Sequence, residues 1–518
     1  MEGSNQLPSS ASSQDEKCTL SQGYAIFQGD KTLRYSGPDL PKDIWHHILS
    51  LMPLRDAARA ACVSRGFLCS WRCRPNLIFT KETLSLEQNR KHRVRKGDKT
   101  CAFASRVDHI LKNHSGIGVK RLELSICDFC GIKVSSIDRW LQIAITPGIE
   151  EIILLLPSNY MEMYNFPLSL LFDGRGSSIQ YLDLMYCTLR PTVGLGCLRS
   201  MAKLCLSDVC IMDDELVSLL SKSFALEELE LRYCSEIICL MIPCLERLKC
   251  LTVFECINLQ MIKSNAPNIT TFSFYGDPIE LSLGESSQVK ELDMSCSDVP
   301  NFICYSITKL PYIVPNLISL TLSSVNEGIN TPTVAAKFLH LQRLEICLEA
   351  DKAMPPEYDY LSLVSFLEAS PVLETFILSV YQYDMKHDSV SEEALHMREM
   401  PEHKHSNLKN VMILGFCSAK SMVELACHVL KNTTSLKSIT LDTVYDCYDV
   451  DKIGRCYTTS AREIGECKPL TRQMILEAER GSMAIERYIL GKVPSTVELT
   501  VRGPCVHCHD IRRAKTRF

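Results

Sequence analysis

The chain has 518 residues, of which 46% are hydrophobic and 23% charged, and its formal net charge at pH 7 is −5. These proportions are typical of a folded globular protein with room for two or three domains, and the small negative charge excludes a cationic field that would recruit nucleic acid or an anionic membrane. The longest aliphatic run, Ile152 to Leu156, is far below the ~20 residues of a spanning helix, so we expect no membrane protein.

The first residues, "MEGSNQLPSSASSQDEKC", are polar and lack the basic start and apolar core of a secretory signal peptide. We expect residues 1–36 to be disordered. With no such signal, the 26 cysteines of the chain indicate reduced thiols, because disulfides rarely persist in the cytosol or nucleus. The expected localisation is cytoplasmic and/or nuclear, and the sequence does not decide between the two.

The stretch "LPKDIWHHILSLMPL", residues 40–54, predicts a short amphipathic helix. Pro41 suits the first helical turn. Ile44, Ile48 and Leu51 fall at i, i+4 and i+7, which places them on one stripe of that helix.

Two further helices are expected at residues 56–63, which are rich in alanine, and at residues 64–71. Three helices in about 40 residues cannot bury this much apolar surface among themselves. An exposed pair of apolar helices is typical of a partner-binding surface. The alternative is that residues 40–71 cap the amino-terminal end of the repeat array that follows.

A basic run, "RKHRVRKGDK", occupies residues 90–99. It fits either a nuclear-localisation or phosphate-binding patch, or the solvated face of a linker. We favour the second interpretation and expect residues 81–118 to be a basic linker and the start of a solenoid.

One short pattern, apolar-x-x-apolar-x-apolar, returns through most of the chain, as in "LEELEL" and "LQRLEI". Steps of 20 to 35 residues separate its copies, and the shorter steps match the period of leucine-rich repeats. We count thirteen copies, which begin at Val119, Ile149, Ile179, Met201, Leu226, Leu248, Ile269, Val289, Leu317, Leu341, Leu373, Leu408 and Leu436.

Each copy predicts a short strand whose alternating apolar side chains face the interior of a solenoid, followed by a helix or turn on the convex side. The expected fold class is therefore an α/β solenoid with a horseshoe of leucine-rich repeats over residues 119–404 and terminal repeats within 405–501. Leucine-rich repeats often carry Asn or Cys at the ninth position. Four cysteines occupy it and are expected to be buried: Cys127, Cys187, Cys234 and Cys256.

Two cysteine motifs raise the question of a metal or haem site. "CDFC" (127–130) has the spacing of half a zinc site, but no partner pair lies near it in the sequence. "CVHCH" (505–509) matches covalent haem attachment or a zinc site. We favour an ordinary polar tail over residues 502–518 and expect no cofactor. The sequence does not decide whether Cys505, Cys508 and His509 bind a metal.

Searches for catalytic patterns find no G-x-S-x-G, Walker-type loop, G-x-G-x-x-G or H-E-x-x-H. Carboxylates and histidines are numerous, yet none has a spacing that would converge on a substrate. We therefore expect a non-catalytic protein.

The stretch "LPKDIWHHILSLMPLRDAARAACVSRGFLCSW" resembles an F-box, which begins Leu-Pro, continues with spaced isoleucines and leucines, and ends Val-Ser-Arg with an aromatic residue and a tryptophan. We place this domain at residues 37–80. With the repeats that follow, the chain resembles plant F-box/leucine-rich-repeat proteins. Its end, from about His405 through "VPSTVELTV", is similar to the FBD-type region of that family.

The resemblance implies a substrate-recognition adaptor of an SCF-type ubiquitin ligase. F-box proteins dock on a Skp-type adaptor and, through it, on cullin, while the repeats hold a protein destined for ubiquitylation and proteasomal degradation. Trp71 would pack within the F-box, and Gly66-Phe67 depart from the usual basic-aromatic pair. Carried over by position, the docking residues are Leu40, Pro41, Ile44, Ile48, Leu51, Pro53 and Val63.

The protein substrate is unknown from the sequence, and the concave face of the repeats is its expected binding surface. We expect neither nucleic acid nor membrane among the partners. The alternative function is a leucine-rich-repeat protein-binding scaffold that acts without ubiquitylation. Positions between the strand leucines supply the candidate substrate-binding residues: Asp183, Glu230, Arg232, Thr252, Tyr275, Asp293 and Glu345.

Overall fold

The computed structural model describes most of the chain between residues 41 and 505. The described residues are 41–86, 96–115, 118–158, 163–172, 177–190, 198–284, 288–296, 301–325, 327, 336–350, 358–382, 389–390, 397–398, 400, 403–445 and 470–505. Within these residues, no helix combines the length and apolar character needed to cross a membrane.

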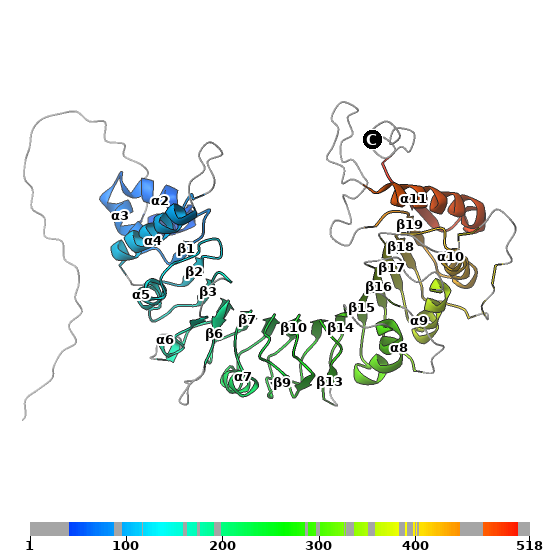
Figure 1. Ribbon diagram of the computed structural model, residues 1–518, viewed down its shortest axis with the longest axis horizontal. Helices are drawn as coiled ribbons and strands as arrows, with labels where there is room; N and C mark the ends of the chain where they lie inside the picture. The colour runs from blue at the N-terminus through cyan, green and yellow to red at the C-terminus, as the bar shows by residue number, and fades with distance from the viewer. Residues whose placement is uncertain are drawn as a thin grey trace, which may run out of the picture.

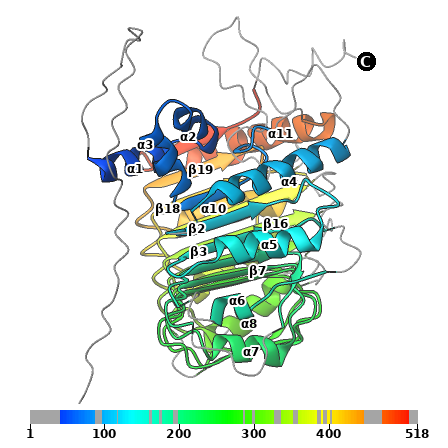
Figure 2. The ribbon, with the colours of Figure 1, turned by 90° about the vertical axis from the view of Figure 1, so that its left-hand side faces the viewer.

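The chain forms a horseshoe with a small helical domain at its amino-terminal end (Figure 1). That domain consists of α1 (Lys42–Leu51), α2 (Leu54–Ala61) and α3 (Arg65–Arg72). A long parallel sheet lines the inner, concave side of the arc, and helices and short strands form the outer layer. Figure 2 shows α4 and α5 lying along this outer layer beside the first strands.

The main sheet pairs fifteen strands in the described part of the chain, all parallel and in the order of the sequence. They are β1 (Asn76–Phe79), β2 (Arg121–Ser125), β3 (Glu151–Leu155), β5 (Tyr181–Met185), β7 (Lys203–Ser207), β8 (Glu228–Arg232), β10 (Cys250–Phe254), β12 (Thr271–Tyr275), β14 (Glu291–Cys296), β15 (Ser319–Val325), β16 (Arg343–Ala350), β17 (Thr375–Gln382), β18 (Asn410–Leu414), β19 (Ser438–Asp442) and β20 (Glu498–Arg502).

The outer layer combines helices with two small parallel sheets. Its strands are β4 (Tyr164–Asn165), β6 (Cys187–Thr188), β9 (Cys239–Ile242), β11 (Met261–Ser264) and β13 (Glu280–Ser282). Its helices are α4 (Lys96–Asn113), α5 (Val134–Ala144), α6 (Ser169–Phe172), α7 (Asp213–Leu220), α8 (Phe302–Ile313), η1 (Tyr360–Leu363), α9 (Val364–Ala369), α10 (Lys420–Asn432), α11 (Arg472–Ala484), η2 (Ile485–Ile489) and η3 (Leu490–Lys492).

The thirteen repeat copies predicted from the sequence correspond to the thirteen strands β2 to β19 of the main sheet, each strand beginning two residues after its copy starts. The predicted α/β solenoid is confirmed. Two strands of the main sheet, β1 and β20, and the five short strands of the outer layer were not predicted. At β1 the first apolar position of the pattern holds Arg74, and the other two hold Leu77 and Phe79. At β20 the first position holds Thr496, and the other two hold Leu499 and Val501.

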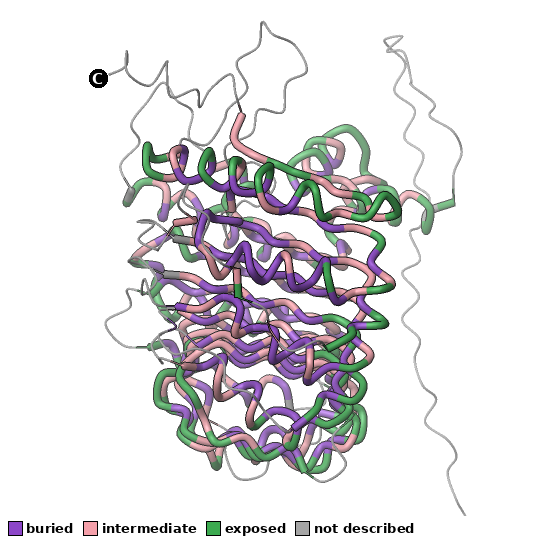
Figure 3. Tube along the Cα trace, turned by 90° about the vertical axis from the view of Figure 1, so that its right-hand side faces the viewer, coloured by how far each residue is buried: buried purple, intermediate pink, exposed green. Residues whose placement is uncertain are grey.

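Burial alternates along each strand because successive side chains point to opposite faces of a sheet. In β2, Leu122 and Leu124 are fully buried, while Arg121, Glu123 and Ser125 lie on the other face. The buried set of all the strands forms one continuous core between the sheet and the outer layer. Figure 3 shows buried stretches throughout the array and exposed ones in the outer turns and on the helices at its ends.

The ninth-position cysteines are buried at three of the four predicted places, Cys187, Cys234 and Cys256. The prediction for Cys127 is wrong, because this residue is exposed. Phe129 fills the core at this repeat instead, with its ring 4.3 Å from that of Phe103. The exposed Cys127 thiol still donates to a backbone carbonyl of the next strand at 3.5 Å, so only its burial differs from the prediction.

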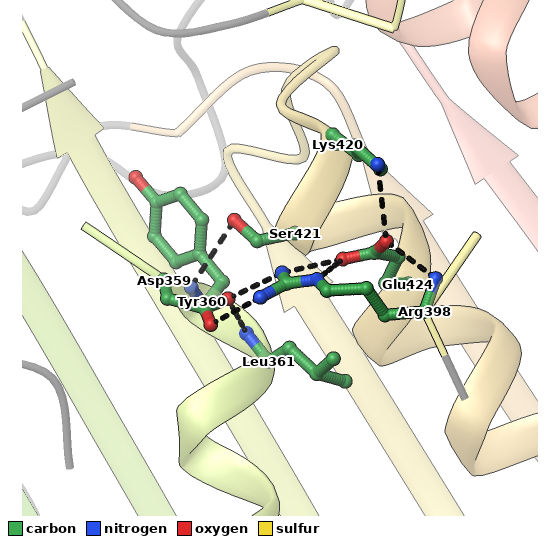
Figure 4. A network of polar contacts seen from close by, with 7 residues as sticks. All are labelled: Asp359, Tyr360, Leu361, Arg398, Lys420, Ser421 and Glu424. Atoms are coloured by element: carbon green, nitrogen blue, oxygen red, sulfur yellow. Dashed lines mark hydrogen bonds and ion pairs between the residues drawn. The ribbon is translucent and has the colours of Figure 1, made fainter. Parts of the chain in front are cut away.

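A network of ion pairs ties the outer layer together near the carboxyl-terminal end (Figure 4). The guanidinium of Arg398 donates to both oxygens of Asp359, at 2.7 and 2.8 Å, and to Glu424 of α10 at 2.7 Å. Glu424 is buried. Nearby, the Ser421 hydroxyl accepts from the backbone nitrogen of Tyr360 at 3.2 Å. A buried carboxylate needs such pairing, so Arg398 joins η1 to α10.

Two histidines form a buried neutral pair in the same region. Asn432 Nδ2 donates to the His428 carbonyl and lies 3.1 Å from His428 Nδ1. We infer that Nδ1 accepts, which leaves the proton on Nε2 to be donated to His405 Nε2 at 3.3 Å. Burial lowers the pKa of both His405 and His428 to about 4.

We predict that Gly415→Ala destabilises the solenoid by more than about 2 kcal/mol. Gly415 follows β18 with φ of +75°, and a Cβ there would lie 1.9 Å from the Val380 carbonyl oxygen. The control is Gly97→Ala in α4, where a Cβ meets nothing within 4 Å, so that stability stays equal or rises slightly. Urea unfolding of the three proteins checks this, and equal midpoints would contradict it.

We also predict that the histidine pair makes the fold acid-sensitive. Because both folded-state pKa values lie below the ordinary 6.5, the unfolded chain takes up protons first as the pH falls. Stability contributed by the neutral pair is complete above pH 6.5 and declines toward pH 4, by about 3 kcal/mol for the pair, which titrates as one coupled unit. Urea midpoints of wild type and His405→Gln across this range measure it. The variant should lose less stability on acidification than wild type does.

Candidate functional site

The three amino-terminal helices bury one side and expose the other. Leu49 of α1 and Leu54, Ala57 and Ala61 of α2 are buried. The rings of Trp45 and Phe67 lie 4.9 Å apart between α1 and α3. Gly66 stands in the first turn of α3, where its backbone nitrogen donates to the Ser64 side chain, so the helix has a normal N-cap.

The other side of this domain carries a row of exposed apolar side chains. Ile44 is 41% exposed, Ile48 36%, Leu51 73% and Val63 82%. Pro41 and Pro53, which precede α1 and α2, are exposed as well. Leu40 lies outside the described residues. The remaining six residues of the predicted docking set are therefore all at the surface.

Trp71 is half-buried at the end of α3, and its indole Nε1 is buried without a hydrogen-bond partner in the structure. It borders a cavity of about 880 Å³ between α2, α3 and α4. Arg55, Arg72 and Arg106 also border this cavity, beside the apolar walls from Leu54 and Leu84.

Arg74 connects the helical domain to the solenoid. Its buried guanidinium donates to the carbonyls of Leu49 at 3.2 Å and Ser50 at 3.0 Å, and also to that of Met52. Its Nε donates to the Asn76 carbonyl of β1 at 3.2 Å. The carbonyls of Leu49, Ser50 and Met52 lie at the end of α1, where a helix leaves its last carbonyl groups without backbone partners. One cation therefore holds the end of α1 against the first strand.

The concave face of the sheet presents three rows of side chains that run across the strands. The middle row follows the strand register from β2 to β16, because each residue pairs with the next: Glu123, Ile153, Asp183, Cys205, Glu230, Thr252, Ser273, Asp293, Thr321 and Glu345. Five of the seven predicted substrate-binding residues share this row. Arg232 and Tyr275 lie in the neighbouring row.

The carboxylates of this middle row have two kinds of partner. Glu230 pairs with Arg232, and Glu345 accepts from Arg343 at 2.8 Å. Asp183 instead accepts from the Tyr181 hydroxyl at 3.0 Å, and Asp293 accepts from that of Tyr275. Burial raises the pKa of both Asp183 and Asp293.

Cys205 separates Asp183 from Glu230 in the middle row and donates from Sγ to Glu230 at 3.4 Å. Burial and the two carboxylates raise the pKa of this thiol to about 12. It is therefore a protonated hydrogen-bond donor, and no nucleophile.

The described residues contain no group of three or more His, Cys, Asp or Glu side chains placed to hold a metal ion. That search includes both cysteines of "CDFC". In the "CVHCH" motif only Cys505 is described, and His507, Cys508 and His509 lie outside the described residues. Residues 90–95 of the basic run also lie outside the described residues. Residues 96–99 of the run form the start of α4, a helix that was not predicted from the sequence.

Comparison with known proteins is consistent with this geometry. A family model described as the At1g61320/AtMIF1 leucine-rich-repeat domain matches residues 110–506. The chain belongs to this leucine-rich-repeat family. A model of the F-box domain matches residues 38–78, which include α1, α2 and α3.

Three similar proteins come from Arabidopsis thaliana. F-box/LRR-repeat protein At5g02910 is 24% identical over 59% of this chain and 66% of its own length. F-box/FBD/LRR-repeat protein At3g26920 is 22% identical over 78% of this chain and 88% of its own length. F-box protein At5g03100 is 24% identical over 38% of this chain and 56% of its own length. The expected resemblance to plant F-box/leucine-rich-repeat proteins is confirmed, and the FBD-type region is supported in part, by the name of the second relative.

We predict that Arg74→Ala loosens the F-box helices of this family member without unfolding its repeats. Several carbonyls at the end of α1 lose their charged donor, which costs about 2 to 3 kcal/mol locally. Hydrogen exchange should then rise in α1 and remain unchanged in β10 and β12. The neighbouring exposed Arg72→Ala is the control. Equal protection of α1 in both variants would show that Arg74 does not hold the junction.

Proposed function

We propose that the chain is the substrate-recognition subunit of an SCF-type ubiquitin ligase. In general terms, an F-box followed by leucine-rich repeats is the arrangement of such an adaptor. The proposal assigns residues 37–80 to docking on a Skp-type adaptor and, through it, on cullin. Residues 119–404 and the terminal repeats within 405–501 form the receptor for the protein to be ubiquitylated.

The observation that supports this proposal most strongly is the exposed apolar row on the F-box. Ile44, Ile48, Leu51 and Val63 remain exposed although the same helices bury Leu49 and Leu54. Covering an apolar side chain of this kind stabilises a complex by about 1 to 2 kcal/mol. The row lies on a domain too small to cover it, so a partner protein accounts for it best.

The proposed mechanism is proximity. Arg74 fixes the F-box to β1, and the continuous sheet fixes β1 to every later strand. A substrate held on the concave face would be kept at a set position relative to the adaptor, which raises the effective concentration of its lysines near the conjugating enzyme. The chain supplies no catalytic group in this scheme and acts in the cytosol and/or nucleus.

The experiment is co-purification of the chain with a Skp-type adaptor and cullin. We predict that wild type retains both partners and that the double variant Ile44→Asp, Ile48→Asp retains neither, with adaptor binding weakened at least about 100-fold. The matched control is Ile238→Asp, Ile257→Asp, which places the same charges on exposed isoleucines of the repeats and should bind like wild type.

Circular dichroism and urea unfolding establish that both double variants remain folded. Adaptor binding without cullin recruitment would support a leucine-rich-repeat scaffold that acts without ubiquitylation. Binding of neither partner by the wild type would show that the F-box helices only cap the solenoid, and it would overturn the proposal.

A further inference from the structure

The middle row of the concave face carries acidic side chains and no cation from β2 to β16. Its charged members are Glu123, Asp183, Glu230, Asp293 and Glu345. The flanking rows supply four cations, and three of them pair with the middle row itself: Arg121 with Glu123, Arg232 with Glu230 and Arg343 with Glu345. The fourth, Lys203, pairs with Glu228 of the flanking row. Asp183 and Asp293 accept from tyrosine hydroxyls instead of a cation, so the middle row keeps an excess of negative charge.

The like charges of this row act on one another. Glu230 adds to the effect of burial in raising the pKa of Asp183, and Glu345 does the same for Asp293. Each carboxylate pair is two strands apart, which is about 10 Å at the usual strand spacing. A cation placed between or above the members of a pair would relieve this repulsion.

An aromatic ladder borders the same row on one side. The rings of Tyr233 and Phe254 lie 5.3 Å apart, and those of Phe254 and Tyr275 lie 5.2 Å apart. Tyr233 is 47% exposed, and the Arg232 guanidinium already stands 5.8 Å from the centre of the Phe254 ring. Aromatic faces attract cations and pack against the apolar stems of Lys and Arg.

We infer that the concave face between β5 and β16 binds an extended, lysine- or arginine-bearing segment of the substrate protein. The segment runs across the strands, with its cations over Asp183, Glu230, Asp293 and Glu345 and its aliphatic stems against the aromatic ladder. This inference rests on the proposed function, because it names the chemical class of the substrate that the receptor holds.

The strand register gives the spacing that such a segment needs. From Asp183, the carboxylates of Glu230, Asp293 and Glu345 follow after two, five and seven strands, or about 10, 24 and 34 Å. An extended chain rises about 3.3 Å per residue, so matching cations are about three, seven and ten residues after the first. A helix, rising about 1.5 Å per residue, would need about 22 residues to span the same carboxylates.

The test uses the full chain and a fluorescent peptide with four lysines at this spacing, separated by Ala, Ser and Gln. A second peptide has the same composition with the four lysines consecutive. We expect the spaced peptide to bind about tenfold more tightly than the second at 0.15 M ionic strength, where unspecific attraction is screened beyond about 8 Å.

The variant for this test is Asp293→Asn with Glu345→Gln, which keeps shape and removes two charges. Its matched control is Glu227→Gln with Glu374→Gln, which also removes two negative charges. Glu227 and Glu374 lie just before β8 and β17, and each is paired with a lysine. We expect about tenfold weaker binding of the spaced peptide by the first variant and unchanged binding by the second.

Equal binding of both peptides, or equal binding by both variants, would overturn the inference. Adaptor and cullin co-purification is measured on the same proteins. The concave-face variant should retain both partners, so a failure of peptide binding with intact adaptor binding rejects this inference alone. Loss of adaptor binding by the wild type would reject the proposed function and leave the peptide result to stand by itself.

Discussion

No repeat of this chain is able to bury its own apolar face. A strand of about five residues has two or three leucine-like side chains, and these are covered only when the strands on both sides and an outer helix or turn are in place. Leu229 and Leu231 of β8, for example, are fully buried between the strands β7 and β10 and the outer layer. Stability is therefore a property of neighbouring repeats, and the unbroken parallel register is its consequence.

The same register fixes the arrangement of surface chemistry. Because side chains alternate, every apolar residue that enters the core places its sequence neighbours on the concave face. Residues more than 150 positions apart, such as Asp183 and Glu345, thus fall into one continuous row. The leucines supply the scaffold, and the positions between them are free to differ without loss of packing.

Much of this arrangement is predictable because the physical cause is local. The pattern of apolar residues predicts the thirteen strands β2 to β19 of the main sheet with a constant offset, and the exposed apolar stripe of α1 follows from helical periodicity. The middle row of the concave face also has a sequence signal, since each of its members is the fifth residue of one repeat copy. Comparing that position between copies would have found Glu123 and Cys205, which the sequence analysis did not select.

What the sequence analysis missed depends on contacts distant in the chain. Cys127 has the expected ninth position, yet it is exposed, while Phe129 is buried against Phe103 of α4. Likewise, Arg398 is unremarkable in the sequence, and its importance comes from Asp359 and Glu424, 39 and 26 residues away. No local pattern contains such information, because the partners are neighbours only in the folded solenoid.

The departures from the repeat pattern have a physical meaning of their own. In the repeats from β2 to β19 the first pattern position holds a buried apolar residue, whereas the first strand of the array meets the end of a helix with unpaired carbonyls. Arg74 replaces the apolar residue there and satisfies several of those carbonyls at once. A leucine at this position would extend the repeat pattern by one copy but leave the end of α1 without donors. The break in the pattern therefore marks the place where a repeat array becomes attached to a different domain, and it is this attachment that would give a substrate on the concave face a fixed position relative to the F-box.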